Sequence, residues 1–175
     1  DAGDLWFFWS PGGLRPGAGG KTFPFIPMYK KILVALENCR ADDTLVPHIA
    51  EFARRLGSAL LLVHVADGWA ARNYESLKLA ESSEIKEDRA YLESVALKLR
   101  EGGAVVKTKL ALGNPPTEIL KTANSEGCDL IAMTSHGHKW VGDFFLGSTI
   151  DKVRHNTTIP ILVVRAGSEL AGRAS

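Results

Sequence analysis

The feature that most constrains the fold is a regular alternation of short apolar runs with longer segments of helical periodicity. Four runs are strongly apolar and rich in branched residues, at 30–36, 58–65, 128–134 and 159–165. Runs of this length and composition are typical of strands that are covered on both faces, as in a parallel sheet. A fifth run, 105–112, alternates apolar residues with lysine and threonine, which predicts an edge strand with one wet face.

Helical segments separate the predicted strands. Helical periodicity occurs over 45–56, over about 83–101 and from the proline pair Pro115-Pro116 up to Gly127. A last helix is predicted to open near the end of the segment 135–146 and to continue to about His155. Asp42 or Asp43 is placed to cap the first of these helices. Strands that alternate with helices at this spacing are joined by right-handed crossovers, which place helices on both faces of one sheet. We therefore predict a three-layer α/β/α sandwich with a five-stranded parallel sheet.

Composition and charge exclude several classes of protein. A chain of 175 residues suits one domain that buries a core without disulfides or metal. Lysine and arginine outnumber aspartate and glutamate by only 21 to 20, so we expect no nucleic-acid or membrane partner. The apolar runs are far shorter than the roughly 20 residues of a membrane-spanning helix. Cys39 and Cys128 form no close-spaced pattern, which favours a reducing compartment and predicts a cytoplasmic protein.

The first 27 residues differ in composition from the rest of the chain. They combine glycine and proline with an aromatic cluster at 5–9, and they lack the basic and sustained apolar segments of a signal peptide. Met28 stands directly before the first predicted strand. We expect residues 1–27 to be a flexible extension, tag or leader and 28–175 to be the folded domain. A functional arm is the alternative.

The loop after the fourth predicted strand carries the strongest indication of a ligand. In an open parallel sheet, ligands bind beyond the carboxyl ends of the strands, where the strand order reverses. Here Gly137 and Gly147 bracket nine residues, and Gly147 leads into Ser148, Thr149 and a helix. Glycine lets backbone amides approach a phosphate closely, and a helix amino terminus presents unpaired N–H groups. The alternative is that Gly137 only makes a left-handed turn and Ser148 only caps the helix.

Over 28–166 the chain resembles the universal stress protein family, whose fold is Rossmann-like and of the adenine nucleotide alpha hydrolase-like type. Nucleotide-binding members of that family carry G-x-x-G, then nine residues, then glycine followed by serine or threonine. This sequence has Thr134-Ser-His-Gly137, nine residues and Gly147-Ser148, followed by the closing strand IPILVVR. Thr134 therefore stands at the first glycine of the motif.

The resemblance implies a bound adenine nucleotide, ATP, with adenine and ribose over the first two strands and the phosphates against the glycine loop. The residues so implied are Ala35 and Glu37 near the nucleoside, Val65 at the adenine, Met133 and Thr134 beside the ribose, and Gly137, His138, Gly147, Ser148 and Thr149 around the phosphates. Glu37 replaces the aspartate of binding members, and Cys39 stands at their common serine. The resemblance also implies a homodimer joined through the last strand. Whether magnesium or manganese accompanies the nucleotide stays open.

Three functions remain open at this point. The first is a stress-response binding or signalling module that holds ATP, and the second is a dimeric interaction module of the same fold without nucleotide. The third, an enzyme acting on an adenylated or phosphorylated molecule, lacks a recognisable acid–base pair or Walker-type lysine, so at most slow hydrolysis is expected. We predict no metal site, because His64, His136 and His138 lack accompanying ligands. No base stands near Cys39 in the sequence, so no catalytic residue is predicted.

Overall fold

The computed structural model of the protein describes residues 28–67, 83–135 and 145–166. Five parallel strands form one sheet in the order β3-β2-β1-β4-β5. The strands are β1 (Lys31–Leu36), β2 (Ala59–Ala66), β3 (Val106–Leu112), β4 (Leu130–Ser135) and β5 (Ile161–Arg165). The predicted strands are confirmed to within a few residues, and β3 lies at an edge of the sheet as its alternating pattern indicates.

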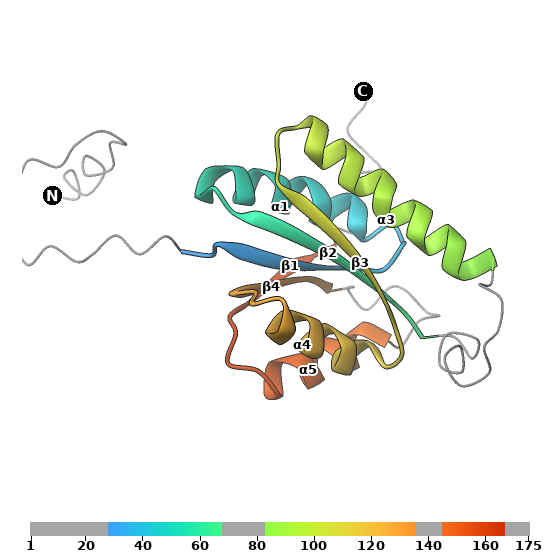
Figure 1. The fold of residues 1–175 in the computed structure, drawn as a ribbon. Coiled ribbons are helices and arrows are strands. Elements are labelled where there is room, and N and C mark those ends of the chain that lie inside the picture. The colour runs from blue at the N-terminus through green and yellow to red at the C-terminus, as the bar shows by residue number, and fades with distance from the viewer. Residues whose placement is uncertain (1–27, 68–82, 136–144, 167–175) are drawn as a thin grey trace, which may run out of the picture.

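Helices cover both faces of this sheet. They are α1 (Asp42–Leu56), α3 (Ser83–Glu101), α4 (Pro115–Ser125) and α5 (Phe145–His155). Figure 1 shows α1 and α3 on one side of the sheet and α4 and α5 on the other. The predicted three-layer sandwich is therefore confirmed. No helix within the described ranges is long and apolar enough to cross a membrane.

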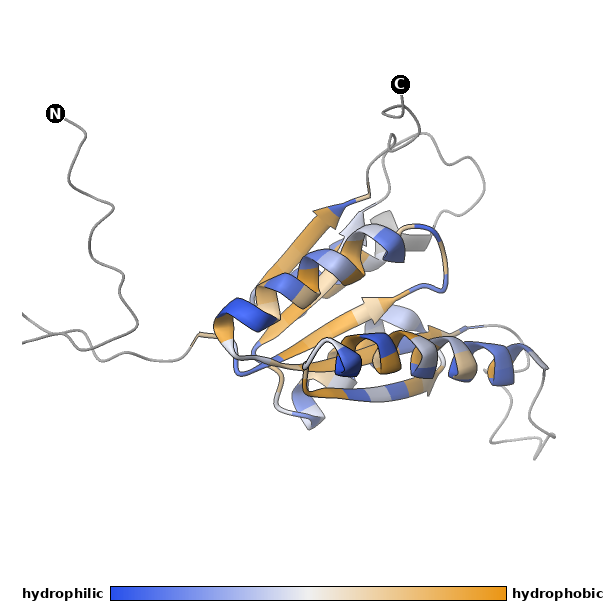
Figure 2. Ribbon diagram, turned by 90° about the horizontal axis from the view of Figure 1, so that it is seen from above, coloured by the Kyte–Doolittle hydropathy of each residue, from blue (hydrophilic) through white to orange (hydrophobic). Residues whose placement is uncertain are grey.

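The alternation of side chains along each strand divides the core into two layers. In β1, Ile32, Val34 and Leu36 pack with α1 and α3, whereas Leu33 and Ala35 pack with α4 and α5. The central strands are buried on both faces, which explains their nearly continuous apolar sequences. In Figure 2 the strands are mostly hydrophobic, whereas the helices carry alternating hydrophobic and hydrophilic bands.

The start of α1 differs from the prediction. The residue before the helix is Ala41, which makes no side-chain cap, so the prediction that Asp42 or Asp43 caps α1 is wrong. Asp42 is instead the first helical residue. Its carboxylate accepts hydrogen bonds from backbone amides in the loop that precedes the helix, and it is only 2% exposed. The side chain therefore shapes that loop and leaves the helix uncapped.

The strand order reverses between β1 and β4, which lie side by side at the centre of the sheet. From β1 the chain proceeds outward through β2 and β3, whereas β4 leads outward in the opposite direction to β5. The pairing of β1 with β4 ends at Val34 and Ala132, although the strands continue to Leu36 and Ser135. The two strands therefore part at their carboxyl ends, where parallel α/β sheets bind ligands.

Candidate functional site

The predicted site residues Glu37 and Thr134 meet where β1 and β4 part. Glu37 follows β1 directly, and Thr134 lies in β4 on the same face of the sheet as Ala132. The Thr134 hydroxyl donates a hydrogen bond of 2.9 Å to Glu37 Oε1. Thr134 is fully buried, whereas Glu37 is partly exposed. Two of the residues predicted to lie near the nucleoside are thus direct partners.

The other residues predicted near the nucleoside contribute to the core. Ala35 and Met133 are buried, and both pack in the layer that contains α4 and α5. Val65 is half-buried and packs against the same layer. All three lie near the carboxyl ends of their strands, as predicted.

On the phosphate side, the structure describes only part of the predicted motif. Gly147 and Ser148 lie in the first turn of α5, which begins at Phe145. The backbone N–H groups of a first helical turn lack partners within the helix, which is why anions bind at helix amino termini in general. Thr149 follows and is 2% exposed. Gly137 and His138 lie outside the described residues.

One buried carboxylate, that of Asp42, organises the loop between β1 and α1. The backbone N–H of Glu37 lies 3.0 and 3.3 Å from the two Asp42 oxygens, and that of Cys39 lies 3.4 Å from Oδ2. The Tyr91 hydroxyl, from α3, donates to the same Oδ2 at 2.7 Å. Burial raises the pKa of Asp42, and these donors act in the opposite direction. Burial and the neighbouring Asp42 carboxylate raise the pKa of Tyr91.

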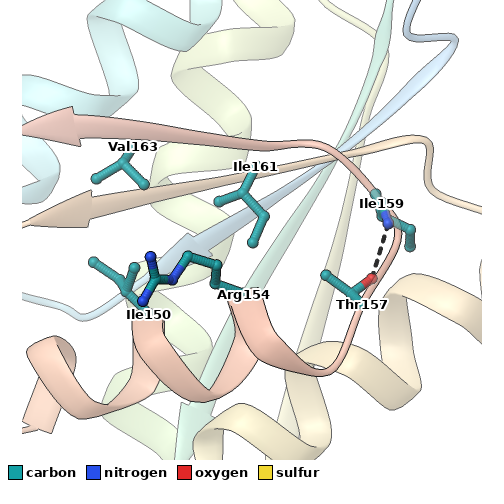
Figure 3. Close-up of a pocket in the computed structure, with 6 residues that line it drawn as sticks. All are labelled: Ile150, Arg154, Thr157, Ile159, Ile161 and Val163. Carbon is teal, nitrogen blue, oxygen red and sulfur yellow. Dashed lines mark hydrogen bonds between the residues drawn. The ribbon is translucent and has the colours of Figure 1, made fainter.

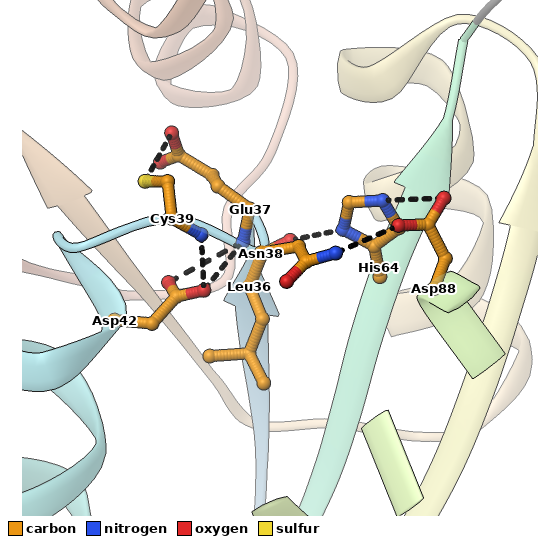
Figure 4. Close-up of polar contacts among 7 residues, drawn as sticks. All are labelled: Leu36, Glu37, Asn38, Cys39, Asp42, His64 and Asp88. Atoms are coloured by element: carbon orange, nitrogen blue, oxygen red, sulfur yellow. Dashed lines mark hydrogen bonds and ion pairs between the residues drawn. The ribbon is translucent and has the colours of Figure 1, made fainter. Parts of the chain in front are cut away.

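A second polar network ties the same loop to β2 and α3 (Figure 4). The ring of His64 lies between the Leu36 carbonyl oxygen, 2.9 Å from Nδ1, and Asp88 Oδ2, 3.3 Å from Nε2. The other Asp88 oxygen accepts a hydrogen bond of 3.1 Å from the Asn38 amide. Asn38 has a φ of +56°, which asparagine tolerates better than most residues. Both ring nitrogens of His64 therefore contact other protein atoms in this network.

Cys39 is not arranged as a nucleophile. The residue is exposed and its thiol lies 3.7 Å from Glu37 Oε2. Partial burial, together with the nearby Glu37 and Asp42 carboxylates, raises its pKa to about 11. The thiol is therefore protonated at neutral pH and is a poor nucleophile. In the part of the chain that the structure describes, no group of three or more His, Cys, Asp or Glu residues could hold a metal ion. His136 and His138, considered above as metal ligands, lie outside that part.

A separate hollow lies between α5 and the face of β5 that carries Ile161 and Val163. It has a volume of about 320 Å³ and is bounded by α5 and β5 (Figure 3). Its lining residues are Ile150, Arg154, Thr157, Ile159, Ile161 and Val163. Val163 is 43% exposed, and β5 is an edge strand of the sheet formed by the described residues. None of the predicted nucleotide residues is among the described residues that line this hollow.

Local sequence patterns do not identify the residues that hold the loop after β1. They predict Asp42 as a helix cap and Tyr91 as part of an apolar helix face, and they assign no role to Asp88. One signal was present: Asp88 and Tyr91 are three residues apart in a charged helix, so they share a face. That α3 turns this face toward the loop after β1 depends on tertiary packing, which no local pattern reports.

The fold and the site define a class: an α/β protein with a doubly wound parallel sheet and a ligand region at the point where the strand order reverses. The model of the universal stress protein family matches residues 28–165. The chain belongs to the universal stress protein family.

Comparisons with individual proteins agree with this assignment. Universal stress protein MJ0577 of Methanocaldococcus jannaschii is 29% identical over 155 residues, which cover 79% of this chain and 96% of that protein. A solved structure of MJ0577 is similar with a TM-score of 0.65 and 29% identity, covering 81% of this chain and 99% of the other.

Two more distant structures share the fold and contain adenine nucleotides. A universal stress protein from Archaeoglobus fulgidus in complex with dAMP has a TM-score of 0.58 and 20% identity, covering 78% of this chain and 98% of that one. A universal stress protein in complex with cAMP has a TM-score of 0.59 and 15% identity, covering 80% and 99%.

Proposed function

We propose that the protein binds an adenine nucleotide, ATP, between the carboxyl ends of β1 and β4, and acts as a stress-response binding or signalling module in the cytoplasm. The observation that carries the proposal is the parting of these two strands beyond Val34 and Ala132, with Glu37 and Thr134 at the opening. This is the position at which sheets of this type bind ligands.

The residues at this position suit a nucleotide. Glu37 offers a partly exposed carboxylate of the kind that accepts hydrogen bonds from ribose hydroxyls. In the proposal, adenine lies beside Val65, and Ala35 and Met133 support it from the core. The phosphates contact the backbone of Gly147 and Ser148 in the first turn of α5, together with Gly137, His138 and Thr149. Two proteins of this fold have been solved with dAMP and with cAMP, so the fold accommodates an adenine nucleotide.

The bound nucleotide serves as a signal in this proposal, with slow hydrolysis at most. Cys39 is protonated at neutral pH because burial raises its pKa to about 11, and the carboxylate of Asp42 is occupied by backbone amides and Tyr91. A magnesium or manganese ion would accompany the phosphates. Binding would change a surface that partners contact at the carboxyl end of the sheet.

A homodimer through β5 completes the proposal. Within the described residues β5 is an edge strand, and edge strands generally offer backbone groups for pairing with another chain. The exposed Val163 and the apolar hollow beside it add surface that a second copy would cover. We also propose the division at Met28 between an extension and the stress-protein domain, which the family match over 28–165 supports.

The second candidate function is a dimeric interaction module that holds no nucleotide. One observation favours it: Thr134 stands at the first glycine of the nucleotide motif, and its hydroxyl is directed to Glu37. A branched side chain at this position restricts how closely a ligand approaches the backbone of β4. In this case the hollow beside β5, rather than the end of β1, would be the functional surface.

A test of bound ligand separates the two functions. The purified protein is denatured, the supernatant is chromatographed for ATP, ADP and AMP, and the refolded or ligand-free protein is titrated with ATP and magnesium. The proposal predicts released adenine nucleotide or a micromolar dissociation constant, which corresponds to about 8 kcal/mol of binding free energy. No released nucleotide and no binding at millimolar ATP would contradict the proposal and favour the interaction module.

A further inference from the structure

Helix α3 presents two polar side chains to the loop that carries Glu37. Asp88 and Tyr91 are three residues apart, and therefore lie on one face of the helix. Asp88 accepts a hydrogen bond from Asn38, and Tyr91 donates one to Asp42. Asn38 and Asp42 stand at the two ends of the segment 38–42, immediately after Glu37. One helix thus contacts this loop at both ends.

The contact through Asp42 reaches the main chain of Glu37 itself. Asp42 accepts the backbone N–H of Glu37 and that of Cys39, while Tyr91 binds one of its oxygens. Asp42 is 2% exposed, so water does not replace a lost partner easily. Hydrogen bonds to a buried carboxylate are stronger than those between neutral groups. The orientation of the Glu37 backbone therefore depends on a hydroxyl group of α3.

The contact through Asp88 fixes the other side of the loop. Asp88 is 8% exposed and binds both Asn38 and His64, whose ring also contacts the Leu36 carbonyl oxygen (Figure 4). Leu36 and Asn38 are the residues on either side of Glu37. Both neighbours of Glu37 are consequently held by one network that involves α3.

We propose that Asp42 and Tyr91 are positioning residues, through which α3 holds the loop 37–41 so that the Glu37 carboxylate faces the nucleotide. The inference rests on the proposed function. It assigns to α3 a role in ligand affinity, although this helix covers the sheet and supplies no residue of the predicted site. The coupling between nucleotide binding and the contacts of α3 is then reciprocal, because a nucleotide held by Glu37 stabilises the contacts between α3 and the loop.

The first arm of the test uses the nucleotide-free full chain. Amide hydrogen exchange is measured at Glu37 and Cys39 in the wild type, in Tyr91→Phe and in Asp42→Asn. Tyr91→Phe removes one hydroxyl and keeps the ring, so we expect exchange at these two amides to become at least about tenfold faster, as for the loss of one hydrogen bond to a charged group. Asp42→Asn is expected to have a larger effect.

The matched control is Ile119→Val, in the core layer on the opposite face of the sheet. It destabilises the whole domain through the loss of a buried methylene group, without touching the loop. Exchange at Glu37 and Cys39 by local opening should stay at the wild-type rate in this variant. If Tyr91 contributed only to overall stability, Tyr91→Phe and Ile119→Val would change exchange at Glu37 and Cys39 equally when they lower the free energy of unfolding equally.

The second arm measures the dissociation constant of ATP with magnesium in the same proteins. We expect Tyr91→Phe to weaken binding about fivefold and Ile119→Val to leave it unchanged. Equal affinity in the wild type and Tyr91→Phe would contradict the inference and leave the proposed function intact. Unchanged exchange at Glu37 and Cys39 in both loop variants would also contradict it. Failure of the wild type to bind ATP would overturn the proposed function and this positioning role together, and faster exchange would then show only that α3 holds the loop.

Discussion

The hydroxyl of Thr134 lies 2.9 Å from Glu37 Oε1, across the point where β1 and β4 part. The resemblance to nucleotide-binding members predicts that Thr134 stands at the first glycine of their motif and Glu37 at a separate aspartate. Each replacement considered alone adds side-chain bulk at the site. In the structure the longer carboxylate of Glu37 meets the hydroxyl of the buried Thr134, so the two replacements are compatible with each other and define one polar element at the opening.

The pairing of these residues predicts an energetic coupling. Thr134→Val replaces the hydroxyl by a methyl group of similar size, and Glu37→Gln removes the charge of the acceptor. Each single change should reduce the free energy of unfolding by about 0.5–1.5 kcal/mol, and the double variant should lose less than the sum. Urea unfolding of the four proteins measures the coupling. Strict additivity would show that the negative charge of Glu37 does not strengthen this hydrogen bond in solution.

The first turn of α5 predicts a specific loss of nucleotide binding. In Gly147→Val a branched side chain stands where backbone N–H groups are proposed to meet the phosphates, so ATP binding should fall at least about tenfold while the circular dichroism spectrum is unchanged. Asp151→Ala, at an exposed position further along the same helix, is the control and should bind as the wild type does. Unchanged affinity in Gly147→Val would place the ligand elsewhere.

The buried Asp42 predicts a pH dependence of stability. Burial raises the pKa of Asp42 above its ordinary value of 3.8, so the folded state binds the proton more tightly than the unfolded state. This contribution to stability is therefore complete below the ordinary pKa and is lost as the pH rises through the raised value. The difference in unfolding free energy between the wild type and Asp42→Asn should change in this direction from pH 3 upward. A difference that is constant over pH 3–7 would contradict the shift.

The exposed edge at β5 predicts the effect of a charge on assembly. We expect the wild type to sediment as a homodimer and Val163→Lys to sediment as a monomer, because a lysine on an edge strand opposes pairing. Val105→Lys is the matched control, since Val105 is 68% exposed beside the opposite edge strand, β3. The control should remain dimeric. A wild type that is monomeric at every concentration would rule out the proposed dimer.

Local patterns were sufficient for the elements of the fold, for physical reasons. The apolar run at 30–36 requires burial on both faces, and the alternating run at 105–112 requires one exposed face, so β1 and β3 fall at the centre and the edge. Right-handed crossovers then place the helices on both sides of the sheet. The start of α1 was the exception, because Asp42 binds backbone amides at positions 37 and 39 instead of its own helix.

The candidate site was predictable where it depends on strand ends and unpredictable where it depends on partners distant in sequence. The carboxyl ends of β1 and β4 follow from the topology, which brings Glu37 near Thr134. The contact of Tyr91 with Asp42 spans 49 residues and follows from how α3 packs, as does that of Asn38 with Asp88. Sequence periodicity identifies the buried face of a helix but does not identify which loop that face meets.

A nucleotide site between β1 and β4 is tested most directly by titrating isotope-labelled protein with ATP and magnesium while the amide resonances are monitored. We expect saturable changes in the amide chemical shifts of Glu37, Val65 and the first turn of α5, with a midpoint in the micromolar range. Shifts confined to the hollow beside β5, or no shifts at millimolar ATP, would contradict a nucleotide site between β1 and β4.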